Sequence, residues 1–117
     1  MTFPAAPLKL DKPLRRGAEL RIRHTVLTAS GAPQDIAGAV FTANVRSGEG
    51  KDTTIIFALT QTVVSNPAGV IDFSLTPAQT LALVSGIDHW ISVWVNHATW
   101  TGGIDRLELH GRLDLIG

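Results

Sequence analysis

Alternation of apolar and polar residues along the chain predicts a series of short β-strands. In residues 18–27, Leu20, Ile22 and Val26 alternate with arginine and threonine, which is the period of a strand with one buried face. The same period predicts strands in four further stretches, which are residues 39–46, 70–75, 87–98 and 104–116. A run rich in β-branched residues predicts one more strand over residues 53–64.

The last two of these stretches carry the most distinctive side chains. Over residues 87–98, one face holds Ile91, Val93 and Val95, and the other face holds Trp90, Ser92 and Trp94. In residues 104–116 four leucines share one parity, and a glycine at position 111 interrupts the run where we expect a β-bulge. The four leucines are Leu107, Leu109, Leu113 and Leu115.

A single helix start stands out among the turns. Thr76 is a suitable N-cap, Pro77 occupies the first helical position, and Gln79 follows the cap by three residues, as in a capping box. The predicted helix is short, and we expect Leu81 and Val84 to close one end of the core.

Together these elements predict an all-β fold, an immunoglobulin-like antiparallel β-sandwich with one short helical turn in a crossing loop. A small β-barrel is the competing architecture. The length of 117 residues fits one domain. Because Pro4, Pro7 and Pro13 disfavour helix, we interpret residues 1–13 as an extended N-terminal arm and residues 14–117 as the sandwich.

Composition narrows the classes of function. Hydrophobic residues make up 44% of the chain and charged residues 17%, which is typical of a globular protein. Ten basic residues balance ten acidic ones, so the sequence predicts neither a nucleic-acid partner nor a membrane surface as partner. No apolar run is long enough for a membrane span or a signal peptide, so we expect synthesis in a cytoplasm.

Residue types that carry chemistry are present but not in recognisable patterns. The chain has no cysteine, and its histidines lack zinc-ligand spacing. His89 and His97 would lie about 26 Å apart along one strand, so we interpret them as surface or strand-end side chains. Serines and carboxylates match no nucleophile motif and no paired-carboxylate motif. The sequence therefore predicts no catalytic residue, no metal ligand and no cofactor.

The tryptophans give the best candidate for a binding surface. Trp90 and Trp94 lie on one face of a strand, and Trp100 follows close behind. Aromatic residues on such a face either stack on sugars or form contacts between proteins. We predict an interaction surface from these tryptophans together with Glu49 and Lys51 of the polar loop in residues 47–52.

The order of these motifs resembles a pattern found in small tail and baseplate domains of tailed phages. It consists of Arg16-Gly17, a strand, the turn Gly31-Ala32-Pro33, the corner in residues 35–39 and a strand that closes on Val45-Arg46. In the second half, residues 69–80 are similar to the strand and capped helix, and residues 109–113 to the closing strand. The resemblance covers nearly the whole chain. It departs in residues 89–94, where the family tends to have a tyrosine-rich strand and this chain has no tyrosine.

The resemblance implies an immunoglobulin-like domain similar to the N-terminal domain of siphophage baseplate upper proteins. From it we expect a non-enzymatic structural component of a phage or prophage tail or baseplate, located in the virion and made in the host bacterial cytoplasm. Its partners would be other phage tail proteins and further copies of itself, as a homo-oligomer in the assembled particle. The alternative function is a carbohydrate-binding module for host or glycan recognition.

Overall fold

The computed structural model describes residues 8–9, 12–48, 53–83 and 89–116 of the chain, with side chains described in residues 14–48, 53–83 and 89–113. Within those residues the regular elements are strands and a short helix. In chain order they are β1 (Leu8–Lys9), β2 (Lys12–Arg15), β3 (Leu20–Thr25), β4 (Val40–Arg46), β5 (Ile55–Ala58), β6 (Thr60–Ser65), β7 (Val70–Leu75), α1 (Pro77–Leu81), β8 (His89–Asn96) and β9 (Arg106–Ile116).

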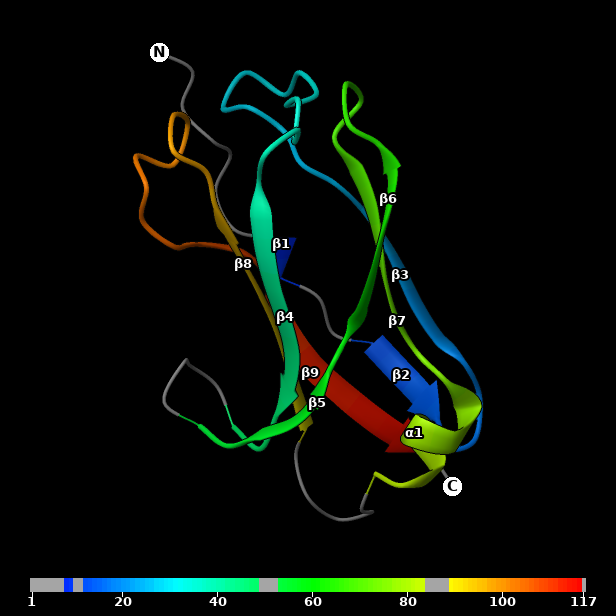
Figure 1. Cartoon of the computed structure of the whole chain (residues 1–117). Coiled ribbons are helices and arrows are strands. Elements are labelled where there is room, and N and C mark those ends of the chain that lie inside the picture. Colours follow the sequence, from blue (N-terminus) through cyan, green and yellow to red (C-terminus); the bar gives the residue numbers. More distant parts are fainter. Residues whose placement is uncertain (1–7, 10–11, 49–52, 84–88, 117) are drawn as a thin grey trace.

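The strands form two sheets that pack face to face as a β-sandwich (Figure 1). The larger sheet has the order β1-β9-β8-β4-β5, with β2 also paired to β9, and the smaller sheet has the order β3-β7-β6. The neighbours β9-β8-β4 and β3-β7-β6 reproduce the two strand sets of an immunoglobulin-like domain. The predicted all-β sandwich is confirmed, and the competing barrel is wrong because the strands form two separate sheets.

The core between the sheets consists of the residues on the apolar parity of each strand. In β7, Ile71, Phe73 and Leu75 are fully buried, and in β8 the inward residues are Ile91, Val93 and Val95. Phe73 meets Phe41 of β4 edge to face, with ring centroids 6.0 Å apart. Each buried side chain of this size stabilises the fold by about 1.5–3 kcal/mol, so these contacts hold the two sheets together.

The first two strands lie along one edge of β9 and run parallel to it. Leu8 of β1 is opposite Leu109, and β2 follows with Arg15 opposite Ile116. Two parts of the segment predicted as an arm, residues 8–9 and 12–13, are therefore extended and paired to the sheet. Their pairing covers an edge of β9 that would otherwise present unpaired backbone groups.

The predicted single strand over residues 53–64 is wrong, because the chain changes sheets in the middle of that run. β5 pairs with β4 in the larger sheet, whereas β6 pairs with β7 in the smaller one. Between them, the N–H of buried Leu59 donates to the carbonyl of Ala43 (2.8 Å). The side chain of Gln61 then donates from Nε2 to the carbonyl of Phe41 (2.8 Å). Beyond the end of β5, the crossing segment therefore still provides hydrogen-bond donors to the backbone carbonyl groups of β4.

The helix signal is confirmed in every part. Thr76 Oγ1 accepts from the N–H of Gln79, and the Gln79 side chain accepts from the N–H of Thr76. The expected core contact of Leu81 is wrong, since this side chain is 58% exposed and Leu83 is buried instead. Val84 lies outside the described residues. Within the described chain no helix is long and apolar enough to span a membrane.

A β-bulge interrupts the pairing of β9 with β8. Val93 is opposite Leu109, but Trp94 is opposite Leu107, so Glu108 is an extra residue in β9. The bulge expected at Gly111 is therefore wrong in position, because Gly111 pairs in register with Ile91. The four leucines have the same sequence parity, but they do not all lie on one face of β9. The extra residue puts Leu107 on the opposite face from Leu109.

The turn between β6 and β7 packs tightly against the loop that follows β3. Gly69 has a φ of 70° and its carbonyl accepts from the N–H of Val26 (2.8 Å). A β-carbon at this position would lie 2.4 Å from the Gln34 carbonyl oxygen and 2.8 Å from that of Val26. Only glycine fits here, both for its positive φ and for the close backbone approach.

A comparison of Gly69 with Gly102 separates the cost of a positive φ from the cost of the close backbone approach, because the two glycines have nearly the same φ. Gly102 has a φ of 69°, but a β-carbon there would meet nothing within 4 Å. We expect Gly102→Ala to cost about 1 kcal/mol, the usual penalty of a left-handed backbone for alanine. Gly69→Ala should cost at least about 3 kcal/mol, because two carbonyl groups must also move. Urea unfolding of both variants measures the difference, and equal losses would contradict the proposed backbone contact.

Candidate functional site

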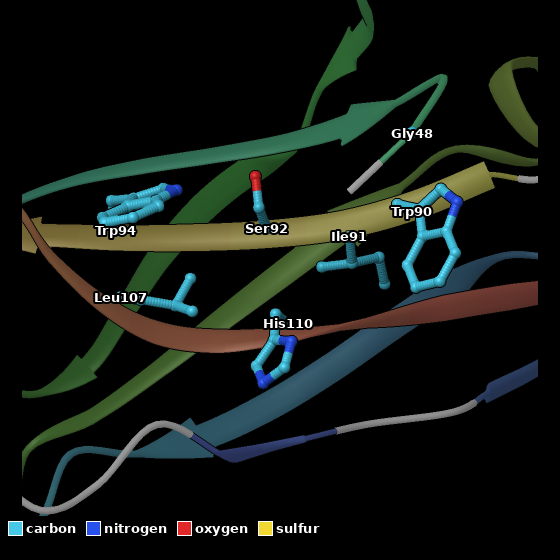
Figure 2. Close-up of a pocket in the computed structure, with 7 residues that line it drawn as sticks. All are labelled: Gly48, Trp90, Ile91, Ser92, Trp94, Leu107 and His110. Atoms are coloured by element: carbon cyan, nitrogen blue, oxygen red, sulfur yellow. The ribbon is translucent and has the colours of Figure 1, made fainter. Parts of the chain in front are cut away.

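A hollow of about 220 Å³ lies on the outer face of the larger sheet, over β8 and β9. Its lining residues are Gly48, Trp90, Ile91, Ser92, Trp94, Leu107 and His110. Figure 2 shows both indole rings carried by β8, with Ser92 between them, and the side chains of Leu107 and His110 on the neighbouring β9. We call this feature the Trp90/Trp94 hollow.

Strand geometry explains how the hollow is built. Trp90, Ser92 and Trp94 alternate with the buried core residues of β8, so they point away from the core. The two tryptophans are four positions apart in the sequence, which places their Cα atoms about 13 Å apart along the strand. The bulge at Glu108 turns Leu107 to the outer face opposite Trp94, and Leu107 forms part of the wall. The lining of the hollow is therefore mainly aromatic and aliphatic.

Polar side chains lie beside the tryptophans on the adjoining strands. Arg46 of β4 is opposite Trp90, and its Nε donates to Ser92 Oγ (3.3 Å) while Nη1 donates to the carbonyl of Thr53 (2.7 Å). On the other side, Arg112 of β9 is opposite Trp90. Arg46 is buried, so its guanidinium group supports Ser92 from beneath the surface. Among the described residues, the lining of the hollow is mainly aromatic and aliphatic.

The third predicted tryptophan belongs to a different cluster. Trp100 lies in the β8–β9 loop, where its ring stacks on His97 with centroids 5.3 Å apart, and it packs partly against the core. His97 organises this loop, since its Nδ1 accepts from the N–H of Thr99 (3.0 Å). Its Nε2 is 3.1 Å from the carbonyl of Ala37, which fits a proton on Nε2. Trp100 therefore has a structural role and does not line the Trp90/Trp94 hollow.

Glu49 and Lys51, the two charged residues predicted for the interaction surface, lie outside the described residues. Gly48, directly before them, lines the hollow. The hydroxyl of Thr53 on the far side of the loop donates to the Gly48 carbonyl (2.8 Å).

The four histidines occupy four separate positions. His24 and His89 are buried, and His89 is the first residue of β8, so the strand-end interpretation is confirmed for His89 and the surface alternative is wrong. His97 follows the end of β8, and His110 lines the hollow. Among the described residues, no three potential metal-ligating side chains of His, Asp or Glu lie together.

The buried His24 pairs with Glu108 across the sandwich. Nε2 of His24 in β3 is 2.7 Å from Oε1 of Glu108 in β9, and the two side chains are only 6% and 8% exposed. This His–carboxylate pair lies between the sheets and is not part of the lining of the hollow. It joins the two sheets through a buried polar contact, which is costly to leave unsatisfied.

An arginine–aspartate ion pair lies on the outer face of the smaller sheet. Arg23 of β3 makes a bidentate contact with Asp72 of β7 at 2.9 and 3.0 Å. The hydrogen bond from Arg23 lowers the pKa of Asp72 below its usual range. The pair therefore stabilises the fold at neutral pH, and this contribution is lost in acid as the pH falls through the lowered pKa of Asp72.

Sequence reasoning identified Trp90 and Trp94 but missed Leu107 and His110. Strand parity gave the tryptophans, because the alternation in β8 is unbroken. The same rule misplaced Leu107, since the extra residue in β9 reverses the parity between Leu107 and Leu109. One signal could have located the bulge. His24 lies on the apolar face of β3, and a histidine buried there needs a polar partner such as Glu108.

Comparisons with known proteins do not identify the chain further. No protein-family model matches it, and no curated protein matches it.

Removal of Glu108 tests the contact between the sheets. Glu108→Ala should lower the free energy of unfolding by about 3 kcal/mol, because His24 is left in the core with an unsatisfied nitrogen. Glu19→Ala is the matched control, since Glu19 pairs with Arg21 in an exposed position and should cost less than about 1 kcal/mol. Urea unfolding measures both. Equal effects for the two variants would show that the buried pair contributes no more than a surface pair.

Proposed function

We propose that this domain is a structural component of a phage or prophage tail or baseplate that works through protein–protein contacts rather than by catalysis. The sequence resemblance to tail and baseplate domains spans nearly the whole chain. The sandwich fold agrees with what that resemblance implies. The Trp90/Trp94 hollow is the observation that carries the proposal, because it provides a surface for such contacts.

The composition of the hollow supports the proposed role in protein–protein contacts. Interface centres are enriched in tryptophan and arginine and depleted in lysine and carboxylates. Here Trp90, Trp94 and Leu107 form an apolar centre, and Arg112 of β9 is opposite Trp90. Tryptophan adds a large contact area with few rotatable bonds, so little entropy is lost when a partner covers it.

The support beneath this surface is rigid. β8 lies in the middle of the larger sheet, paired to β4 on one side and to β9 on the other. The backbone that carries both tryptophans is therefore fixed before a partner binds, which lowers the cost of association. Other tail proteins and further copies of this chain are the partners that we propose.

Replacement of Trp94 tests the proposed function. In a concentration series followed by light scattering, alone and with co-expressed products of the adjacent genes, the natural chain should form particles larger than one copy. Trp94→Ala should weaken this association at least about tenfold, as expected for a central interface tryptophan. Ile104→Ala is the control, because Ile104 is a 66% exposed hydrophobic residue away from the hollow. If Trp94→Ala and Ile104→Ala associate like the natural chain, the hollow is not the interface.

Carbohydrate recognition is the second candidate. The observation that favours it is the placement of Trp90 and Trp94 on one face of one strand, with an open hollow between them. Flat apolar faces of sugar rings can stack on such indoles. On a glycan array, this function predicts binding that Trp90→Ala and Trp94→Ala both abolish. An array without signal at high protein concentration would eliminate the carbohydrate function.

A further inference from the structure

β6 forms an exposed edge of the smaller sheet. The order of that sheet is β3-β7-β6, so among the described strands β6 pairs on one side only, with β7. Its residues, Thr60–Ser65, include no charged residue, no proline and no glycine, and none of them is buried. An edge strand of this composition leaves backbone N–H and C=O groups open to pairing with another strand.

Val63 shows that the inner face of the sheet is not fully covered at this edge. It is opposite the buried Ile71, and because opposite residues of an antiparallel pair share a face, Val63 points to the core side. Nevertheless, the side chain of Val63 is 51% exposed, and that of its neighbour Val64 is 46% exposed. A strand added beside β6 would remove this apolar surface from water.

The regular part of β6 is held in an extended conformation before any partner binds. Residues 60–63 pair in register with β7, and the β-bulge follows only at Val64, near the end of the strand. Gln61 also fixes the strand to the other sheet through its hydrogen bond to the carbonyl of Phe41 (2.8 Å). Residues 60–63 are therefore ordered for pairing, which lowers the entropic cost of adding a strand.

We propose that β6 pairs antiparallel with β6 of a second copy of this chain, about a two-fold axis perpendicular to the sheet. The two smaller sheets then join into one sheet with the order β3-β7-β6-β6-β7-β3, and their inner faces stay on the same side. Because β6 carries no charge, no like charges are opposed when it meets its own copy. Threonine pairs across neighbouring strands add favourable contacts.

The other edge of the smaller sheet is a poorer partner for β6. β3 exposes Arg21 and Arg23, and Arg23 is held by Asp72 of β7. Pairing of β6 with β3 of another copy would leave one edge of each kind free, and association would continue into a fibre. Pairing of β6 with β6 uses the uncharged edge of both copies, so this contact ends at the dimer.

The inference goes beyond the proposed function, because it assigns a second interface. The β6 edge belongs to the smaller sheet, whereas the Trp90/Trp94 hollow lies on the outer face of the larger sheet. The two contacts can therefore be removed separately. A pairing of two short strands is a small interface, so we expect a dimer that dissociates on dilution.

A charge on the inner side of β6 tests the inference in the Trp94→Ala background, which removes contacts through the hollow. Sedimentation velocity over a concentration series should show a reversible monomer–dimer equilibrium. Adding Val63→Lys should raise the dimer dissociation constant at least about tenfold, because an inward-pointing lysine on an edge strand blocks strand pairing. The half-exposed position lets this lysine reach water in the monomer, so the fold is retained.

Val40→Lys is the matched control for this experiment. Val40 is 66% exposed on β4 of the larger sheet, so a lysine there should leave the dissociation constant unchanged. Three results would overturn the inference: a monomer at every concentration, growth beyond the dimer, or the same dimerisation after Val63→Lys as after Val40→Lys. A monomer would leave the β6 edge to a strand of a different protein.

Distances between spin labels test the strand order without a charged substitution, since the chain has no cysteine of its own. In the dimer, labels on Thr62→Cys lie on neighbouring strands about 5 Å apart across the sheet. Labels on Thr25→Cys, an exposed position of β3, are separated by five strand spacings, or about 24 Å. Electron paramagnetic resonance should therefore give a clearly shorter distance for position 62. An equal or longer distance at position 62 would overturn the inference.

The failure of this inference is distinguishable from the failure of the proposed function. If Trp94→Ala still forms dimers that Val63→Lys dissociates, and larger particles do not depend on Trp94, the β6 contact stands and the assembly role of the hollow is wrong. If Trp94→Ala alone reduces every association to the monomer, the hollow is the contact between copies and the β6 contact is wrong.

Discussion

The extra residue in β9 determines how the two faces of the larger sheet are used. Without Glu108 as an insertion, simple alternation would put Leu107 inward with Leu109 and leave the acidic residue outside. The bulge instead turns Glu108 into the core, where it meets His24 of the opposite sheet at 2.7 Å. It also turns Leu107 outward to the tryptophans. One local irregularity therefore creates both a polar contact between the sheets and a wall of the hollow.

Several backbone positions at the edges of the larger sheet are covered within the domain. β1 and β2 cover one edge of β9, and the crossing segment with Leu59 and Gln61 satisfies carbonyls of β4 beyond the end of β5. Backbone groups at these positions are thus used within the domain, and pairing with another strand is suppressed there. Recognition through side chains on the face of β8 is consistent with this arrangement.

Much of the fold followed from local signals, whereas the features that depend on two distant segments did not. Thr76, Pro77 and Gln79 specify a helix start by themselves, and alternation located β3, β4, β7 and β8. The change of sheet at Leu59 could not be read from residues 53–64, because both halves are β-branched and only contacts with β4 and β7 divide them. Parity also placed Trp90 and Trp94 correctly, but it failed beyond the bulge, since insertion of one residue leaves no local mark in a leucine-rich run.

The free energy gained when a partner covers the hollow is small compared with the cost of bringing two free proteins together. Full covering of one tryptophan removes about 200 Å² from water, which corresponds to about 5 kcal/mol at ~25 cal/mol per Å². Trp90 and Trp94 are already partly buried in the fold, so together they offer a new partner less than about 10 kcal/mol. Association of two free proteins costs an amount of the same order, about 4–15 kcal/mol. A contact through this hollow alone is therefore weak, and a stable contact requires that several such contacts act together.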